Sequence, residues 1–522
     1  MASKATHASL WLPGFEIDAP AYPDLFSSND EAAAPAADPP AESSESATAG
    51  TAGLITAVVA ASLGAKVALI EKHLMGGDCL NVGCVPSKGV IRAATAWADV
   101  RNAEEFGLHI PPDVKYDFAA AMARMRKLRA RISHNDSVHR YTKLGVDVYI
   151  GSGRFTGQDI IEVRGPAGNR TLQFVKAAIC TGARATAPPT PGLKEAGYLT
   201  NETVFTLTEL PARLCVIGAG PIGCELAQAF ARFGSRVYLV EAMHGIMPNE
   251  DRDAAQVVHE SMGRDGIQLL CCGKDLSVSK AEGGKRLTVD SHGQHYDVTV
   301  DEILVGVGRS PNVEGLGLES VGVEYDKAGV KVNDRLQTTN SRIYAAGDIC
   351  SRYKFTHAAD AMAGIVIQNA LFPHPFGLAY AGVNSLIMPW CTFTEPEIAH
   401  VGIYEADAKA KGIEVDTFTF KLDEVDRAIL DGEDNGFARV HVKKGTDQIL
   451  GATIVASHAG DMINEYTLAM KAGVGLGTIS GVIHPYPTQA EVVKKTTNLW
   501  RKTTFTEGKK RFLRKLFAWA RK

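Results

Sequence analysis

Blocks of apolar residues separated by glycine-rich turns predict two nucleotide-binding units. Residues 211–242 run from an apolar segment at 214–217 through a glycine-rich turn and a helical pattern to a second apolar segment that ends at Glu241. Short apolar runs between turn signals are typical of buried strands, so this order predicts strand, turn, helix and strand. Residues 48–71 repeat the order from the helix onward and end at Glu71. This alternation indicates an α/β chain with parallel sheets.

The second unit carries a complete phosphate-binding phrase. Gly218, Gly220 and Gly223 form G-x-G-x-x-G between the predicted strand and helix, which lets a pyrophosphate approach the helix N-terminus. Glu241 ends the next strand 18 residues after Gly223, where a carboxylate accepts hydrogen bonds from a ribose and repels a 2′-phosphate. We therefore expect NAD(H) to be preferred over NADP(H). A purely structural turn with a surface glutamate is the alternative.

The first unit lacks the start of this phrase. It reads Thr48-Ala-Gly50-Thr-Ala-Gly53, and the residues before it, PPAESSES, are unsuited to a buried central strand. Glu71 nevertheless ends the following strand 18 residues after Gly53. We expect an adenine dinucleotide site here, with a structural helix–strand pair as the alternative and an alternatively joined N-terminus as one explanation of the abrupt start.

Two cysteines follow the first unit in the phrase GGDCLNVGCVPSK. Cys79 and Cys84 lie five residues apart at a predicted helix start, where the positive helix end favours a thiolate suited to thiol–disulfide exchange. A zinc site needs a second pair of ligands, and Cys180, the next cysteine, stands alone. No structural metal is predicted. The adjacent Cys271 and Cys272 follow a strand-like run and are interpreted as structural residues.

Composition limits the function classes. The chain has 522 residues, 45% of them hydrophobic and 22% charged, which predicts a globular protein of several domains. A net charge of −4 provides no field to gather nucleic acid, so no nucleic-acid partner is expected. Nine cysteines are too few for a secreted disulfide framework, which favours a reducing compartment such as the cytoplasm and leaves an organelle open. No targeting peptide is recognised.

Both ends of the chain differ from the rest. Residues 1–47 include a low-complexity stretch and are predicted to be disordered. The uncharged stretch 46–65 is only weakly hydrophobic, so a buried helix is favoured over a membrane span. Residues 506–522 predict a basic amphipathic helix that docks on the protein's own surface in preference to a membrane or a partner. Its apolar face comprises Phe512, Leu513, Leu516, Phe517 and Ala520.

Four further phrases support a family resemblance: ICTGARA at 179–185, VGVGRSPN at 305–312, IYAAGDI at 343–349 and HPYPTQAE at 484–491. With the cysteine pair, they resemble the class I pyridine nucleotide-disulfide oxidoreductases over residues 48–505. The resemblance implies two Rossmann-like domains, for FAD and NAD, and an α+β dimerisation domain in a homodimer. The implied division is 48–205 and 331–382 for FAD, 206–330 for NAD, 383–505 for the interface and 506–522 for the tail.

The resemblance also implies residue roles. Cys84 would be the flavin-proximal thiolate and Cys79 the thiol that exchanges with substrate, while Lys88 and Glu225 would form an ion pair beside the flavin. Asp348 would bind the ribityl chain. The full implied FAD set is Gly50, Gly53, Glu71, Lys72, Gly77, Thr181, Gly182, Gly347, Asp348 and His357, and the NAD set is Gly218, Gly220, Gly223, Glu241 and Gly308.

One position departs from the family pattern. Tyr486 stands where the family's H-x-H-P-T phrase has its second, proton-transferring histidine, and His484 and Glu491 remain as relay candidates. A tyrosine here is similar to mercuric reductase, so transient Hg(II) binding at Cys79, Cys84 and Tyr486 is expected. The substrate would be a small disulfide or a thiol complex of a soft metal. The alternatives are a dihydrolipoamide dehydrogenase or glutathione-reductase-like enzyme and, if FAD binding is lost, a non-catalytic NAD-binding dimeric scaffold.

Overall fold

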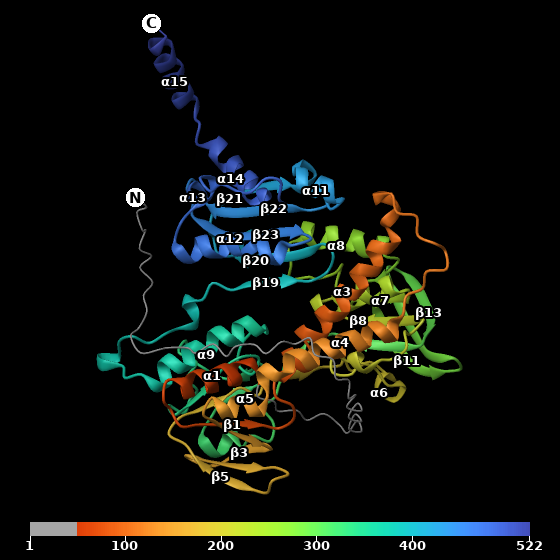
Figure 1. Cartoon of the computed structure of the whole chain (residues 1–522), viewed down its shortest axis with the longest axis vertical. Helices are drawn as coiled ribbons and strands as arrows, with labels where there is room; N and C mark the ends of the chain where they lie inside the picture. The colour runs from red at the N-terminus through yellow and green to blue at the C-terminus, as the bar shows by residue number, and fades with distance from the viewer. Residues whose placement is uncertain (1–49, 522) are drawn as a thin grey trace, which may run out of the picture. The chain divides into compact units, whose positions relative to one another are not determined.

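The second nucleotide unit forms a four-stranded parallel sheet in the computed structural model, which describes residues 50–521 (Figure 1). The strand order is β10-β9-β8-β14, and in-register pairing of Ile217 with Val240 places the carboxyl ends of β8 and β9 side by side. Helix α7 is buried from Gly223 to Phe233 because it lies between this sheet and α3. The elements of the unit are β8 (Arg213–Ile217), α7 (Pro221–Phe233), β9 (Arg236–Val240), α8 (Arg252–Arg264), β10 (Gln268–Leu270), the antiparallel strands β11 (Lys274–Ala281), β12 (Gly284–Ser291) and β13 (Gln294–Val300), and β14 (Glu302–Val305).

The first nucleotide unit has a divided sheet. Strand β1 (Val67–Glu71) pairs in parallel with β2 (Val146–Ile150), and β6 (Ala177–Ile179) pairs in parallel with β18 (Ile343–Ala345), as two separate sheets within residues 50–521. Helix α1 (Thr51–Ser62) packs beside α9 (Thr356–Leu371), as Figure 1 shows. The segment 1–47 that was predicted to be disordered, and Thr48, lie outside the described residues.

Helices and small sheets surround these pairs. The helices are α2 (Gly77–Asn81), α3 (Cys84–Arg101), α4 (Phe118–Ser133), α5 (Val138–Lys143) and α6 (Leu193–Ala196). The strands are β3 (Ser152–Gly157), β4 (Ile160–Arg164), β5 (Arg170–Gln173), β7 (Ala183–Ala185), β15 (Arg309–Pro311), β16 (Tyr325–Asp326) and β17 (Gly329–Val330). Short 3-10 helices are η1 (Ala103–Phe106), η2 (His134–Asp136), η3 (Val204–Thr206), η4 (Leu318–Val321), η5 (Pro375–Gly377), η6 (Val383–Ser385) and η7 (Leu422–Glu424). Pairing of β7 with β15 joins the residues before and after the second unit.

The C-terminal region is built on a five-stranded antiparallel sheet in the order β19-β20-β23-β22-β21. Helix α12 packs on β20 and β23, and α14 packs on β21 and β22, which buries a separate apolar core (Figure 1). The elements are β19 (Pro389–Thr392), β20 (Glu397–Gly402), α10 (Glu405–Ala410), β21 (Val415–Lys421), α11 (Asp426–Asp431), β22 (Phe437–Lys443), β23 (Ile449–Ala456), α12 (Ala459–Ala472), α13 (Leu476–Ser480) and α14 (Glu491–Thr503).

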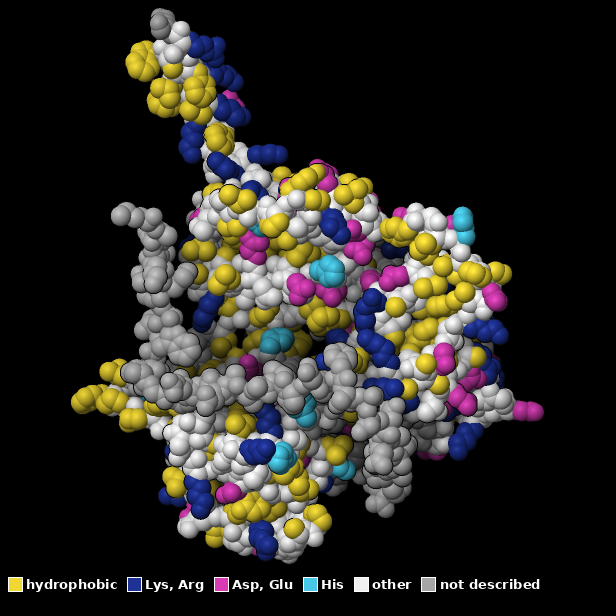
Figure 2. All heavy atoms as spheres, in the orientation of Figure 1, with side chains coloured by type: hydrophobic (Ala, Val, Ile, Leu, Met, Phe, Trp, Pro, Cys, Tyr) yellow, Lys and Arg dark blue, Asp and Glu magenta, His cyan; other side chains and the backbone are white. Residues whose placement is uncertain are grey.

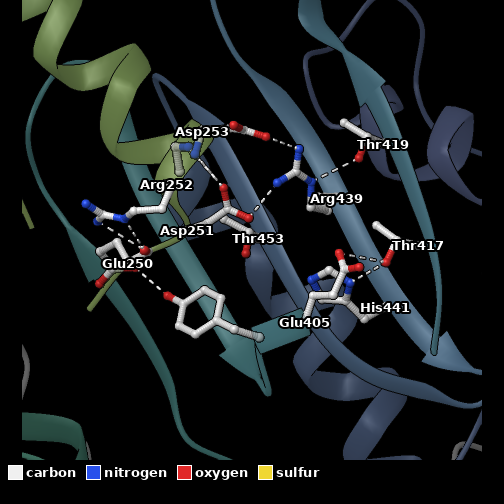
Figure 3. A network of polar contacts seen from close by, with 12 residues as sticks. Glu250, Asp251, Arg252, Asp253, Glu405, Thr417, Thr419, Arg439, His441 and Thr453 are labelled. Carbon is white, nitrogen blue, oxygen red and sulfur yellow. Dashed lines mark hydrogen bonds and ion pairs between the residues drawn. The ribbon is translucent and has the colours of Figure 1, made fainter. Parts of the chain in front are cut away.

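A polar network joins the start of α8 to this antiparallel sheet (Figure 3). Asp251 caps α8 by accepting from the backbone N–H of Asp253 at 2.9 Å, and its other carboxylate oxygen lies 2.6 Å from Nη1 of Arg439 on β22. Nη2 of the same arginine lies 2.7 Å from the Asp253 carboxylate. Because Arg439 and Asp251 are mostly buried, these contacts fix the second unit against the C-terminal sheet.

The chain ends in an amphipathic helix, α15 (Glu507–Ala520), as predicted. Figure 2 shows hydrophobic side chains on one side of this helix and Lys and Arg side chains on the other. The expected docking on the protein's own surface is not seen within residues 50–521, because α15 buries none of its residues and Phe512 and Phe517 are 65% and 53% exposed. None of the helices described in residues 50–521 is long and apolar enough to cross a membrane.

Candidate active site

The two candidate thiols lie on consecutive helices. Cys79 is in α2, and Cys84 is the first residue of α3. Gly83 makes the turn between them, and a Cβ at this position would lie 2.8 Å from the carbonyl oxygen of Asp78, so a side chain would force the turn open. Both cysteines are free thiols. Of the two, only Cys84 begins a long helix, as the sequence predicted for the pair, and Cys79 lies on the short helix before it.

The pKa values of the two thiols are shifted in opposite directions. A hydrogen bond between them lowers the pKa of Cys84 to about 6 and raises the pKa of Cys79 above its ordinary value. Thr356 Oγ1, 3.4 Å from Cys84 Sγ, and the Lys88 ammonium also lower the pKa of Cys84, whereas burial opposes them. Cys84 is therefore the thiolate of the pair near neutral pH.

Lys88 lies one turn along α3 from Cys84 and is held from two sides. Its Nζ lies 2.8 Å from Oε2 of Glu225 on α7, a side chain that is only 6% exposed. The ammonium also lies 4.4 Å from the centroid of the Phe393 ring, and the backbone N–H of Phe393 donates to Glu225 Oε1 at 2.9 Å. The predicted Lys88–Glu225 ion pair is present, and it keeps a positive charge beside the thiolate.

Both cysteines line a cavity of about 1030 Å³ that extends along the first unit. Its wall includes Gly50, which starts α1 without a side-chain cap, so the first N–H groups of that helix are left for a ligand. Five predicted FAD residues line this cavity: Gly50, Gly182, Gly347, Asp348 and His357.

Polar groups in this cavity wall fit a polar ligand such as FAD. Nε of Arg309 is buried without a hydrogen-bond partner among the described residues, and it lies 3.4 Å from Oδ2 of Asp348. Burial raises the pKa of Asp348, and it lowers the pKa of Lys354, whose Nζ donates to the Asp348 carbonyl at 2.9 Å. Buried polar groups of this kind need partners, and a flavin side chain with hydroxyls and phosphates would provide them.

The other five predicted FAD residues do not line this cavity. They are Gly53, Glu71, Lys72, Gly77 and Thr181. Glu71 is fully buried at the end of β1 and accepts from the backbone N–H of His73 at 2.7 Å. Thr181 donates to the carbonyl of Asn312 at 2.9 Å, and Gly53 is buried within α1. The structure therefore brings half of the predicted FAD residues to one cavity wall.

A second cavity, of about 1850 Å³, lies at the carboxyl ends of β8 and β9. Four predicted NAD residues line it, namely Gly218, Gly220, Glu241 and Gly308. The Glu241 carboxylate accepts from the backbone N–H groups of Ala219 at 2.8 Å and Met243 at 2.9 Å, which fixes it at the edge of the glycine turn. Gly223 does not line the cavity. It packs on the turn, where an added Cβ would lie 1.9 Å from the Gly218 carbonyl oxygen.

The two cavities adjoin. Pro221, Ile222 and Arg309 line both of them, and Glu225, one turn further along α7, lines the first. The second cavity therefore borders the wall of the first cavity that holds the Lys88–Glu225 pair.

The C-terminal candidates are not brought to the thiols within one chain. His484, Tyr486 and Glu491 line neither cavity. His484 Nε2 lies 3.0 Å from Oε2 of Glu465, Tyr486 is 70% exposed, and its hydroxyl donates to Asp426 at 2.7 Å, which raises the tyrosine pKa. Glu491 lies 3.8 Å from Lys495. Of the three, Tyr486 is the exposed one, whereas the His484 side chain is only 7% exposed.

The sequence analysis did not identify several cavity residues that lie outside the recognised motifs. Besides Thr356 and Phe393, the cavity contains Cys391, whose thiol donates to Oε2 of Glu397 at 3.8 Å. The same carboxylate oxygen accepts from the backbone N–H of Gly460 at 2.9 Å, and burial raises the pKa of Glu397 to about 6. No local sequence motif marks these positions. Cys391 reaches the cavity from β19 of the C-terminal sheet, far along the chain from the two thiols.

Comparison with known proteins agrees with this geometry. Residues 49–363 match the family model described as pyridine nucleotide-disulphide oxidoreductase, and residues 388–497 match its dimerisation domain. The chain is 34% identical to a mercuric reductase of Bacillus cereus over 446 residues, which are 85% of this chain and 69% of that protein. It is 30% identical to a dihydrolipoyl dehydrogenase of Bacillus subtilis over 457 residues, which are 85% and 94% of the two chains.

Solved structures show the same architecture. The HOCl-induced flavoprotein disulfide reductase RclA of Escherichia coli, in its Cu(II) complex, superposes with a TM-score of 0.76 at 27% identity, over 87% of this chain and 98% of RclA. LpdA of Mycobacterium tuberculosis gives a TM-score of 0.78 at 25% identity, with the same shares covered.

Proposed function

Since the chain belongs to the class I pyridine nucleotide-disulfide oxidoreductases, an FAD-dependent family that uses NAD(P)H, we propose that its Cys79–Cys84 pair carries electrons from NADH to a disulfide or a thiol-bound soft metal. The observation that carries the proposal is the joined cavity system. The first cavity is lined by the low-pKa thiol and the ammonium–carboxylate pair, and the adjoining second cavity is lined by the glycine-rich turn, which supports a nicotinamide site there.

In this proposal the residues of the first cavity hold FAD, which supplies two-electron transfer between nicotinamide and thiols when it is bound. Gly50 lets the phosphates approach the start of α1, and Asp348 binds the ribityl hydroxyls. Gly218, Gly220, Glu241 and Gly308 hold the nicotinamide nucleotide, and Glu241 disfavours a 2′-phosphate. The domain division given by the sequence, with FAD residues at 48–205 and 331–382 on either side of the NAD residues 206–330, is part of the same proposal.

The proposed thiol chemistry assigns a different step to each cysteine. The Cys79 thiol attacks the substrate disulfide, forms a mixed disulfide and passes its proton to the departing half of the substrate. The Cys84 thiolate then attacks the Cys79 sulfur, which releases the second half as a thiolate and leaves the Cys79–Cys84 disulfide. That thiolate takes up a proton from solvent, and a hydride equivalent from NADH restores the Cys79 thiol and the Cys84 thiolate. In the reduced pair, the hydrogen bond from Cys79, with Thr356 and Lys88, keeps Cys84 charged until it attacks.

A mercuric-reductase-like substrate is the version we favour, because Tyr486 replaces a neutral-pH proton carrier with a phenol whose pKa is raised. A phenol of this kind is a poor proton shuttle for disulfide turnover but can serve as an oxygen ligand. In the proposed homodimer, the exposed Tyr486 of one subunit would complete the cavity of the other. Dihydrolipoamide oxidation is the second candidate, supported by the 30% identity to the dihydrolipoyl dehydrogenase, against 34% to the mercuric reductase.

One pair of assays separates these versions. Purified flavin-loaded protein is tested for NADH-driven reduction of Hg(II) in excess thiol and for NAD-driven oxidation of dihydrolipoamide. We expect the first activity to exceed the second. A dominant second activity reverses the substrate assignment, and loss of both, with flavin bound, rejects the two named substrate classes. A chain that binds NADH but no flavin is the dimeric scaffold instead.

A further inference from the structure

A second group of thiols lies in the NAD unit, outside both steps of the proposed chemistry. Cys271 and Cys272 stand with His244 and His292 so that one ligand atom from each lies within 4.8 Å of the other three. Cys271 Sγ is 3.1 Å from His292 Nε2, and Cys272 Sγ is 3.5 Å from His244 Nδ1. Cys271 is buried, with 8% of its surface exposed, and Cys272 is partly buried.

Three separate loops bring these four residues together. His244 follows β9 and the two cysteines follow β10, and the carboxyl ends of these neighbouring parallel strands lie at one edge of the sheet. His292 comes from the turn between β12 and β13. The backbone N–H of Cys272 donates to the Met243 carbonyl at 3.0 Å, which fixes the two strand ends to each other. Because the ligands are far apart in sequence, no compact metal motif marks them.

The backbone at two of these positions is held in an uncommon conformation. Cys272 has φ of 54° and His292 has φ of 50°, and both values are in the left-handed region that non-glycine residues seldom adopt. His292 and Gly293 form a two-residue hairpin turn with both φ values positive, which directs His292 towards Cys271. Ser291, the last residue before this turn, donates to the Cys271 carbonyl at 2.6 Å. Both conformations thus place a ligand side chain in the cluster.

We propose that His244, Cys271, Cys272 and His292 form a tetrahedral Cys₂His₂ site for a d¹⁰ divalent cation such as Zn²⁺. Zinc bound to thiolate at about 2.3 Å and to imidazole at about 2.0 Å separates its ligand atoms by roughly 3.3–3.8 Å. The contacts of 3.1 and 3.5 Å are close to this range, so small side-chain movements would close the site. Two thiolates and two neutral imidazoles balance the charge of the ion, and the two thiol protons go to solvent on binding.

The site adjoins the nucleotide cavity. Gly273, which follows Cys272, donates its backbone N–H to the Glu241 carbonyl at 2.9 Å, and both residues line that cavity. An ion held here would tie together the two loops that carry the ribose-binding carboxylate. The inference does not depend on the proposed substrate or on the Cys79–Cys84 chemistry.

The test uses full-length, flavin-loaded protein in which Cys79 and Cys84 are both serine, because the active-site thiols would bind soft metals themselves. Zinc is removed with chelator under reducing conditions, and the protein is titrated with Zn²⁺ against a chromophoric competitor. We expect one zinc per chain. H244A/H292A should weaken the affinity at least about a hundredfold, since loss of a ligand costs more than loss of an outer partner. C271S/C272S should abolish stoichiometric binding.

H295A is the matched control, because His295 lies on the same hairpin, is exposed and pairs with Asp290 at 2.6 Å. This variant should bind zinc like the background. Titration with Co²⁺ provides a second measurement. The intense visible bands of a tetrahedral thiolate complex should appear in the background protein and in H295A, and should be absent from H244A/H292A and C271S/C272S. The absence of stoichiometric zinc in the background, or unchanged affinity in H244A/H292A, overturns the proposal. Melting temperatures identify any variant whose loss of binding reflects unfolding.

Discussion

The two nucleotide units share an order of elements but differ in how much of each site the chain itself completes. In the second unit, β8 precedes the glycine turn, and Gly218 and Gly223 pack so tightly that a Cβ would lie 2.6 Å from Gly306 O and 1.9 Å from Gly218 O, respectively. In the first unit, α1 begins at Thr51 beside a divided sheet, and a Cβ at Gly50 would meet nothing closer than 3.8 Å. Gly220, the equivalent glycine of the second unit, is open in the same way, so the packed positions of the second unit are Gly218 and Gly223.

This difference separates two roles of glycine. A glycine that packs against backbone is needed by the folded chain whether or not a ligand is present, whereas a glycine with open space beside it is needed only by the ligand. The second unit is therefore a site built into its own fold. The first unit has room for a ligand at the start of α1, and we expect FAD to supply contacts that the residues around Gly50 leave open.

The largest effect is expected from Cys84→Ser, which tests whether the cavity of the first unit is an oxidoreductase site. Without the low-pKa thiolate, disulfide or Hg(II) turnover should fall on the order of 10³-fold or more. Reduction of the bound flavin by NADH should survive, because both nucleotide cavities are unchanged. Stopped-flow absorbance and steady-state assays measure the two steps. Cys350→Ser is the control, since its thiol donates to the Gly347 carbonyl as a hydroxyl can. Turnover retained by Cys84→Ser would remove this thiol from the mechanism.

Two glycine substitutions, one at a packed position and one at an open position, test the two roles of glycine. Gly223→Ala should lower the free energy of unfolding by about 1–3 kcal/mol or more, because the new Cβ would meet backbone, and should raise the KM for NADH. Gly50→Ala should change stability by less than about 0.5 kcal/mol but weaken FAD binding by about tenfold. Denaturant unfolding of flavin-free protein and flavin titration check both. If Gly50→Ala destabilises the flavin-free chain as much as Gly223→Ala does, the contrast is wrong.

Glu241→Gln sharpens the assignment of the second unit to NADH. The amide keeps the size of the side chain but removes the charge that repels a 2′-phosphate, so the preference for NADH over NADPH should fall about tenfold, equivalent to about 1.4 kcal/mol. Ratios of kcat/KM for the two nucleotides give the answer. Glu260→Gln, an exposed change on α8, is the control. An unchanged ratio would show that Glu241 serves only the backbone N–H groups of Ala219 and Met243.

The smallest expected effect is a shift in pH dependence. Because the pKa of Cys84 is lowered to about 6, its thiolate is present above that pH and is lost as the pH falls through it. In the two-electron-reduced protein, the long-wavelength thiolate–flavin absorbance should therefore rise with a midpoint near pH 6. Lys88→Gln should move this midpoint upward by less than about one unit, since the ammonium is not the largest cause of the lowered pKa. A downward shift would contradict the role of Lys88.

The sequence predicts most of what local patterns can encode. The strand–turn–helix–strand order of 211–242, the thiols beside Lys88 and Glu225, and the amphipathic helix at the C-terminus are all present in the structure. Contacts between residues that are far apart in the sequence could not be predicted from local patterns. Thr356 reaches Cys84 from α9, and His244 and His292 reach the vicinal cysteines from separate turns. The exposure of the apolar face of α15 was also not predicted. Amphipathic periodicity identifies an apolar face but does not indicate which surface covers it.

The most direct test of the central claim is the flavin content of the purified chain. If the first cavity is an FAD site, protein incubated with FAD and freed of excess should retain about one flavin per chain, with a visible flavin spectrum that NADH bleaches. A chain that binds NADH but retains no flavin after this treatment would contradict the claim that Cys79 and Cys84 are the thiols of an FAD-dependent oxidoreductase.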